Sequence, residues 1–279
     1  MFWGGLFIMK IFSKQILVFV SLGFIVFLII LLNQQPLLSK EVGESREKKP
    51  ENNLEKIQTK SPAQSPVLEV AKKSAEKILP DNFLIKNVPF ISQAPKKIWD
   101  DLHREACEEA TLIIAKNYLD NNRASEINAQ AGDKEIKKMV AWQEENWGGH
   151  FDLSLKKVKE MAEKIYGIKS EVADIENSDD IKKIVSAGKL VIAPTAGREL
   201  KNPYFQNPGP IYHMVVIFGY DKNNFITHDV GTRRGANYQY DQKILLNAIH
   251  NLPREIVIKE ELLANSKLIF SGKKSVLVF

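Results

Sequence analysis

The sequence predicts an α+β domain over residues 81–279, with N-terminal helices packed on an antiparallel sheet. Apolar residues recur at helical spacing in the first half of this region, whereas the second half holds short β-branched and aromatic runs broken by Gly, Asn, Pro and Lys. The chain of 279 residues is 44% hydrophobic and 26% charged, which is enough to bury a proper core. Helices first and strands afterwards favour α+β over alternating α/β.

The chain begins differently. Residues 16–32 read ILVFVSLGFIVFLIILL, a run without charge that is long enough to cross a bilayer as a helix. Lys10 and Lys14 precede it, so the positive-inside tendency places the N-terminus in the cytoplasm and the rest outside. We therefore expect residues 1–33 to form a cytoplasmic tip and a transmembrane signal anchor, which makes the protein single-pass in the cell membrane with an extracytoplasmic domain. A cleaved signal peptide is the alternative, although LLNQQPLLSKE offers no small-x-small cleavage site.

Residues 34–80 are rich in Lys, Glu, Pro, Ser, Asn and Gln, a composition that predicts a disordered stalk. Residues 1–80 hold 11 Lys and Arg against 7 Glu, while the remainder holds 28 basic residues against 27 acidic ones. The predicted domain is therefore almost neutral and lacks the basic footprint of a nucleic-acid partner. No nucleotide-binding Gly-Lys-Ser/Thr motif is present, so no nucleotide partner is expected.

The first half of the domain contains three helical patterns. They cover residues 106–122, 133–147 and 153–167. Gly148 and Gly149 stop the second helix, and Asp152 or Ser154 caps the third, which Gly167 ends.

The second half reads as strands with one helical interruption at 241–252. The predicted strands cover residues 188–196, 212–220 and 224–230 and a closing pair within 267–279. The polar residues 221–223 separate the second and third strands and predict a hairpin turn.

Cys107 is the only cysteine, so no intramolecular disulfide can form. It lies just ahead of the first turn of the first predicted helix, where backbone N–H groups and the helix dipole favour a thiolate. Glu108 and Glu109 oppose this effect if they lie close. Burial of the cysteine as a small hydrophobe is the alternative. The absence of a second cysteine and the irregular spacing of five histidines argue against zinc, and we expect no metal or cofactor.

A nucleophilic cysteine needs a base and an orienting group for that base. If the two strands around 221–223 pair residues whose numbers sum to 442, His213 lies opposite Asp229, close enough for the carboxylate to hold the imidazole in one tautomer. His228 then points to the other face. The alternatives are a satisfied core histidine at 213 and a turn cap at 229.

The oxyanion of such a reaction needs N–H donors. Gln93 ends an apolar run fourteen residues before Cys107, and its side-chain N–H together with the Cys107 backbone N–H is a workable pair. An ordinary loop residue is the alternative reading of Gln93.

Four of these segments, in this order, resemble those of a known family. VPFISQAPKKIWDD and ACEEA, followed by YHMVVIFGYD and FITHDVGT, resemble the stand-alone, extracytoplasmic relatives of the bacteriocin-processing, double-glycine-leader cysteine peptidases, a papain-like group. The resemblance covers about residues 84–250. It implies a papain-like cysteine peptidase domain that acts on a peptide or protein substrate. Carried over position by position, it makes Cys107 the nucleophile, His213 the general base, Asp229 the orienting group and Gln93 the oxyanion donor.

Two positions depart from the family pattern. Ala106 precedes the nucleophile where glycine is common, and Val230 follows the aspartate where proline is frequent. The chain also lacks the transporter segments to which the leader peptidases are fused. Coupling of cleavage to export is therefore not implied within this chain and would need a separate export partner.

Two segments dense in Pro, Gly, Asn and aromatic residues predict loops that lead to the cleft. Their candidates for substrate contact are Tyr204, Phe205, Arg233 and Arg234. Loop packing for the aromatic residues and a solvated turn for the arginines are the alternatives.

The predicted function is peptide-bond hydrolysis by acyl transfer through Cys107 to water. Two other functions stay open. A cell-wall amidase would share the anchor and the mechanism but act on peptidoglycan stem peptides. A non-catalytic, membrane-tethered binding module would hold a peptide in the same papain-like cleft without cutting it, and the reactivity of Cys107 distinguishes it from both enzymes.

Overall fold

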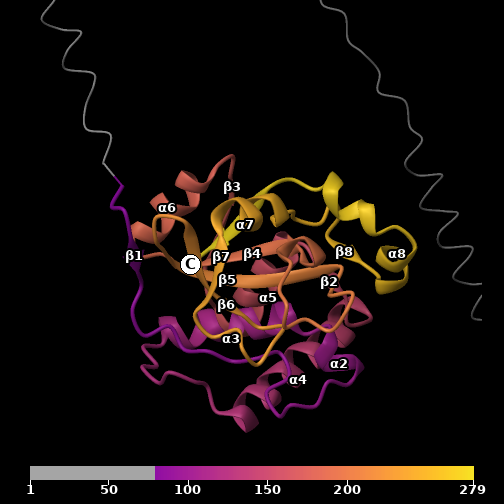
Figure 1. Ribbon diagram of the computed structural model, residues 1–279. Helices are drawn as coiled ribbons and strands as arrows, with labels where there is room; N and C mark the ends of the chain where they lie inside the picture. Colours follow the sequence, from indigo (N-terminus) through magenta and orange to yellow (C-terminus); the bar gives the residue numbers. More distant parts are fainter. Residues whose placement is uncertain (1–78) are drawn as a thin grey trace, which may run out of the picture. The chain divides into compact units, whose positions relative to one another are not determined.

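The computed structural model describes residues 79–279 (Figure 1). The predicted anchor and almost all of the predicted stalk lie outside these residues. Within them, no helix is both long enough and apolar enough to cross a membrane.

The centre of the fold is a seven-stranded antiparallel sheet in the order β3-β9-β4-β5-β6-β7, with β1 paired to the end of β5. Its strands are β1 (Phe83–Leu84), β3 (Glu171–Asp174), β4 (Val191–Ala196), β5 (Tyr212–Tyr220), β6 (Asn224–Asp229), β7 (Tyr238–Asp241) and β9 (Ser275–Val278). A separate two-stranded sheet pairs β2 (Asp152–Leu153) with β8 (Ile256–Val257). The predicted α+β class is confirmed.

The helices cover the sheet from both sides. They are α2 (Asp101–Arg104), α3 (Cys107–Leu119), α4 (Ala129–Trp147), α5 (Leu155–Tyr166), α6 (Ser178–Ser186), α7 (Gln242–Ala248) and α8 (Lys259–Ala264), with 3-10 turns η2 (Gly197–Leu200) and η3 (Ser266–Ser271). α3 and α4 lie on one side of the sheet, and α6 and α7 lie on the other (Figure 1).

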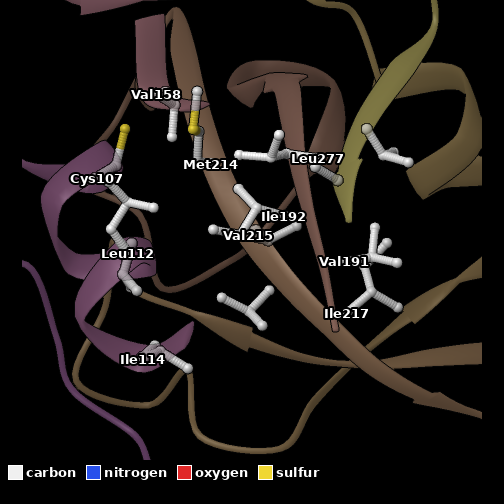
Figure 2. Packing of buried hydrophobic residues seen from close by; sticks show 14 of the residues in the cluster. Cys107, Leu112, Ile114, Val158, Val191, Ile192, Met214, Val215, Ile217 and Leu277 are labelled. Carbon is white, nitrogen blue, oxygen red and sulfur yellow. The ribbon is translucent and has the colours of Figure 1, made fainter. Parts of the chain in front are cut away.

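β5 is buried along its whole length because helices cover both of its faces. This explains why its sequence, YHMVVIFGY, is continuously apolar instead of alternating. Leu112 and Ile114 of α3 pack in the same core as Val215 of β5 (Figure 2). The strand that carries His213 is therefore held rigidly at the centre of the domain.

The helix ends follow their local sequence. Gly148 and Gly167 adopt left-handed backbone conformations, with φ of 84° and 67°, immediately after α4 and α5, as the predicted stops require. Ser154 occupies the N-cap position of α5. α4 begins at Ala129, four residues before the predicted start, because the Asn128 side chain accepts hydrogen bonds from two backbone N–H groups of its first turn.

The predicted closing strand pair is wrong. Its first part forms the 3-10 turn η3, and only Ser275–Val278 forms a strand, which pairs with β3 and β4. The predicted strand 188–196 begins only at Val191. Three further elements were not predicted: α6, which the Asn177 capping box starts, and the strands β3 and β7.

The predicted register between β5 and β6 is wrong by two residues. Val215, and not His213, lies opposite Asp229, and the register shifts once more between Ile217 and Gly219. A shift of two residues keeps every side chain on its face, because strand side chains alternate with a period of two. His213 therefore remains on the face of Asp229 as its diagonal neighbour.

His228 points to the opposite face, as predicted. Its Nε2 donates to the Val88 carbonyl over 3.0 Å, and its Nδ1 accepts from the Asn237 N–H over 3.2 Å. Its ring packs against Phe90 and Phe218. Both ring nitrogens are thus used by the fold, which makes His228 a structural residue.

The pKa of His228 supports a prediction about acid stability. Burial lowers this pKa from 6.5 to about 4. Between these values the unfolded chain binds a proton here that the folded chain excludes, so stability is lost as the pH falls. We expect the free energy of unfolding to drop by roughly 2 kcal/mol between pH 7 and pH 4.5 from this group alone. Urea unfolding of the full chain at pH 7 and pH 4.5 measures it.

His228→Gln is the matched variant, because an amide can still donate to one partner and accept from the other but does not titrate in this range. The acid-induced loss of stability should be smaller in this variant than in the parent. Equal losses in both proteins would contradict the assignment of a buried, neutral His228.

Candidate active site

A cavity of about 400 Å³ brings together three of the four predicted catalytic residues: Gln93, Cys107 and His213. Cys107 is the first residue of α3, and His213 is the second residue of β5. The fourth predicted residue, Asp229, ends β6 and lies behind His213, with no exposed surface. Four residues that lie far apart in the sequence are thus close together in the fold.

The Asp229 carboxylate accepts four hydrogen bonds. Oδ1 accepts from His213 Nε2 over 2.8 Å and from the Gly231 N–H over 2.9 Å. Oδ2 accepts from Asn202 Nδ2 over 2.8 Å and from the Tyr240 hydroxyl. Burial alone would raise the pKa of Asp229, but His213 and these donors hold the pKa below its usual value. Asp229 is therefore a fixed negative charge.

The bond to Asp229 fixes how His213 can act. Because Nε2 carries the hydrogen that Asp229 accepts, the neutral imidazole has its basic lone pair on Nδ1. No hydrogen bond joins Nδ1 to another residue in the described part of the chain, and His213 lines the cavity. The Phe205 ring meets the imidazole edge-on at 5.3 Å between centroids. A base is thus held in one orientation at the cavity wall.

Gly231 is required beside this imidazole. A Cβ atom at residue 231 would lie 2.8 Å from His213 Cε1 and 3.0 Å from a carbon of the Phe205 ring. A Cβ atom in a real protein essentially never lies within 3.0 Å of another heavy atom that is not bonded to it or next to it in the chain. The glycine of the DVGT segment therefore allows Asp229 and His213 to meet.

The Cys107 thiol is restrained on its own helix. Sγ donates to Glu108 Oε2 over 2.9 Å, and the residue is only 4% exposed. Burial, and then the charge and hydrogen bond of Glu108, raise the pKa of Cys107 well above its usual value. These effects outweigh the helix N-terminus, which by itself favours the thiolate. In this arrangement no hydrogen bond joins Sγ to His213, so reaction requires the thiol to turn away from Glu108.

Glu108 is buried because it holds two parts of the fold together. Its Oε1 accepts from the Leu153 N–H of β2 over 3.0 Å, while Oε2 accepts from the thiol. Burial, and then the nearby charges of Glu109 and Asp152, raise the pKa of Glu108 well above its usual value. Glu109, also buried, accepts from Gln143.

The amide of Gln93 is engaged with the backbone. Nε2 donates to the carbonyls of His103 and Arg104, each over 2.9 Å, and Oε1 is buried without a hydrogen-bond partner among the described residues. The Gln93 N–H also donates to the Val230 carbonyl over 2.9 Å. Gln93 thus lies beside the cavity, but both of its side-chain hydrogens already have acceptors.

The two departures from the family pattern fit without strain. Ala106 has φ of −99° and ψ of 32°, a conformation that needs no glycine. Val230 is buried, and its carbonyl accepts from both the Gln93 N–H and the Ser92 hydroxyl.

The predicted substrate contacts divide between two neighbouring pockets. Phe205 lines the cavity of Cys107. Tyr204, Arg233 and Arg234 line a second pocket of about 360 Å³, which shares residues such as Gly231 with the first. Arg234 stacks over the Tyr204 ring at 4.9 Å.

Three residues of the site, Asn202, Tyr240 and Asp152, were not predicted from the sequence. The opposing effect of Glu108 on the thiolate was expected, but its hydrogen bonds to Sγ and to Leu153 were not. Asn202 and Tyr240 complete the shell of Asp229, and Asp152 lines the cavity. Neither Asn202 nor Tyr240 lies in a recognisable motif, so only the tertiary arrangement could identify them. Within residues 79–279, no group of three or more His, Cys, Asp or Glu side chains is placed to hold a metal ion.

Most residues of the cavity lie within a segment of the chain that matches a known protein family. A thiol, a carboxylate-bound imidazole and an amide around one cavity are the groups that nucleophilic cysteine chemistry uses. Residues 85–252, more than half of the chain, match the Peptidase_C39 like family, and the chain belongs to this family.

A crystal structure described as that of a candidate C39-like peptidase from Bacillus anthracis is similar to this chain, with a TM-score of 0.45 and 14% sequence identity. The match covers 71% of this chain and 97% of the other. No curated protein matches the chain significantly.

The restraint on the thiol gives a prediction. Glu108→Gln removes a negative charge beside Sγ but keeps an oxygen that can accept from Leu153, so we expect the pKa of Cys107 to fall. The pH dependence of iodoacetamide labelling measures this pKa directly, because the chain has a single cysteine.

Asp174→Asn serves as the control, since this exposed carboxylate on β3 does not line the cavity. Its labelling midpoint should match that of the parent. An unchanged or higher midpoint in Glu108→Gln, with circular dichroism showing a folded chain, would refute the restraint.

Proposed function

We propose that this protein is a papain-like cysteine peptidase that hydrolyses peptide bonds through Cys107, His213 and Asp229. The observation that carries the proposal is the His213 imidazole, bound through Nε2 to the buried Asp229 while it lines the cavity of Cys107. A histidine that only filled the core would not need a buried carboxylate behind it, and here that carboxylate is held by four hydrogen bonds. Membership of the C39-like peptidase family supports a peptide substrate.

In the proposed mechanism, His213 Nδ1 takes the proton of the Cys107 thiol and the resulting thiolate attacks the carbonyl carbon of the substrate. His213 then gives this proton to the leaving amine as the C–N bond breaks and a thioester forms. In the second half, His213 takes a proton from water as the water oxygen attacks the thioester carbonyl. The C–S bond then breaks, the carboxylic acid product leaves, and His213 returns the proton to the Cys107 sulfur. Asp229 stabilises the imidazolium that forms in each half.

The proposed oxyanion donors are the Cys107 backbone N–H and the Gln93 side chain. Gln93 currently donates both of its hydrogens to the carbonyls of His103 and Arg104. One of them would have to be released to the substrate oxygen, so substrate binding must shift the end of α2 or rotate the amide.

A non-catalytic peptide-binding module is the second candidate. Two observations favour it: the thiol donates to Glu108 instead of His213, and the Gln93 hydrogens are already bonded. The same cavity could then hold a peptide without cutting it. Activity measurements separate the two functions.

We expect the full chain to cleave members of a mixed peptide library, and Cys107→Ser to abolish this cleavage. His213→Ala should lower kcat/KM by about 10² to 10⁴, the usual contribution of a general base. Mass spectrometry of the digest gives the cleaved bonds, and peptidoglycan stem peptides in the library test the amidase alternative.

His228→Gln is the matched control, because this histidine lies on the opposite face and should leave cleavage at neutral pH unchanged. Binding of library peptides without cleavage by the parent would favour the binding module over the peptidase.

We also propose that residues 16–32 anchor the protein and that the domain lies outside the cytoplasm. The apolar run and the lysines before it support this orientation. The chain should stay in the membrane fraction after carbonate extraction, and protease added to intact spheroplasts should degrade the domain. Release by carbonate, or protection from the protease until the cells are lysed, would contradict it. A shortened, freely released chain would identify the segment as a cleaved signal peptide instead.

A further inference from the structure

The charged side chains that line the Cys107 cavity differ in whether they have a hydrogen-bond or ion-pair partner. Besides Cys107 and His213, they are Arg104, Glu105, Asp152, Arg198 and Lys259. Lys259 Nζ pairs with Glu105 Oε1 at 2.7 Å, Arg104 lies 3.6 Å from Asp101, and Arg198 Nε donates to the Gly209 carbonyl. No hydrogen bond or ion pair joins the Asp152 carboxylate to any other residue that the structure describes. Asp152 is therefore the one unpartnered charge of this set.

The backbone that carries this carboxylate is held in place through Leu153, its neighbour in the chain. The Leu153 N–H donates to Glu108, and the Leu153 carbonyl accepts from the Tyr212 hydroxyl over 2.9 Å. Glu108 and Tyr212, which both bond to Leu153 of β2, are the sequence neighbours of Cys107 and His213. The backbone of Asp152 therefore has a fixed position relative to this pair.

The environment of Asp152 lacks a compensating donor. The residue is 8% exposed, and burial, and then the charge of Glu105, raise its pKa to about 7. His150 and Lys259 act in the opposite direction, and Glu109 adds to the repulsion, but none of these groups forms an ion pair with Asp152. A buried carboxylate without a partner destabilises the site unless a ligand supplies a donor. A cationic nitrogen would supply both the donor and the opposite charge.

We propose that Asp152 is the specificity residue of the cleft and binds a cationic nitrogen of the substrate, from a Lys or Arg side chain or a free amino terminus, beside the bond that Cys107 attacks. The identity of the ligand as a peptide rests on the proposed function, whereas the preference for a cation rests on the cavity alone. An anionic group at this position would be repelled by the Asp152 carboxylate.

The cation preference can be measured without any catalysis. Two thiol reagents of similar size, trimethylammonium-ethyl and sulfonatoethyl methanethiosulfonate, react with the single cysteine but carry opposite charges. At pH 8, where Asp152 is largely ionised, the full chain should react faster with the cationic reagent. The ratio of the two rates cancels any change in the thiol pKa, since both reagents need the same thiolate.

Asp152→Asn should lower this ratio, on the order of five-fold, because it removes one charge at short range in a partly buried site. Asp174→Asn, which neutralises an exposed carboxylate outside the cavity, should leave the ratio unchanged. An equal ratio in the parent and in Asp152→Asn, with both proteins folded by circular dichroism, would overturn the proposal.

Peptide cleavage then identifies the source of the cation. Among peptides cleaved by the parent, those with Lys near the scissile bond should lose kcat/KM in Asp152→Asn by a similar factor, while norleucine analogues should not. If acetylation of the amino terminus removes the preference, the free terminus is the ligand group; if the preference survives acetylation, a side chain is. Cleavage that shows no preference for a cation in the parent would count against the proposal.

The two hypotheses can fail separately. A ratio that falls in Asp152→Asn although no peptide is cleaved would support the cation site and refute the peptidase. Cleavage that depends on Cys107 while the ratio ignores Asp152 would support the peptidase and refute the cation site.

Discussion

The buried Asp229 carboxylate is the interaction on which the candidate site depends. A charge without exposed surface is tolerated only when donors replace its water, and here His213, Gly231, Asn202 and Tyr240 do so. These donors come from β5, from β7 and from the segments after η2 and β6. One carboxylate therefore fixes the imidazole and also ties the loop that carries Phe205 to the sheet.

The Cys107 thiol, unlike the His213 imidazole, is held in an arrangement that disfavours its reactive form. Glu108 holds Cys107 through Sγ and β2 through Leu153, so the same carboxylate that stabilises the local fold disfavours the thiolate. The imidazole is ready to act, whereas the thiol must first leave its acceptor. A ligand that fills the cavity and supplies a donor near Glu108 or Asp152 would weaken this restraint. Such a coupling would keep the thiol protonated, and so less reactive, until a ligand is bound.

Much of this was predictable because it is local or has a strict period. The ends of α4 and α5 follow from glycines at 148 and 167, and the face of His213 follows from strand alternation. The β5–β6 register could not be predicted, because neither the turn geometry nor the irregularity near Phe218 leaves a signal in the sequence. The 3-10 turn at 266–271 was mistaken for a strand because a short apolar run fits both. Asn202, Tyr240 and Asp152 gain their roles only from long-range contacts.

The central claim is that His213, oriented by Asp229, serves as the base for Cys107. Its most direct test is the pH dependence of Cys107 alkylation in the full-length parent, His213→Ala and Asp229→Asn. The account predicts that the labelling midpoint rises in His213→Ala, because the thiolate loses the imidazolium that stabilises it, and rises in Asp229→Asn, because that imidazolium loses its carboxylate. A midpoint that ignores both substitutions in folded protein would contradict the claim and leave the cavity as a peptide-binding site.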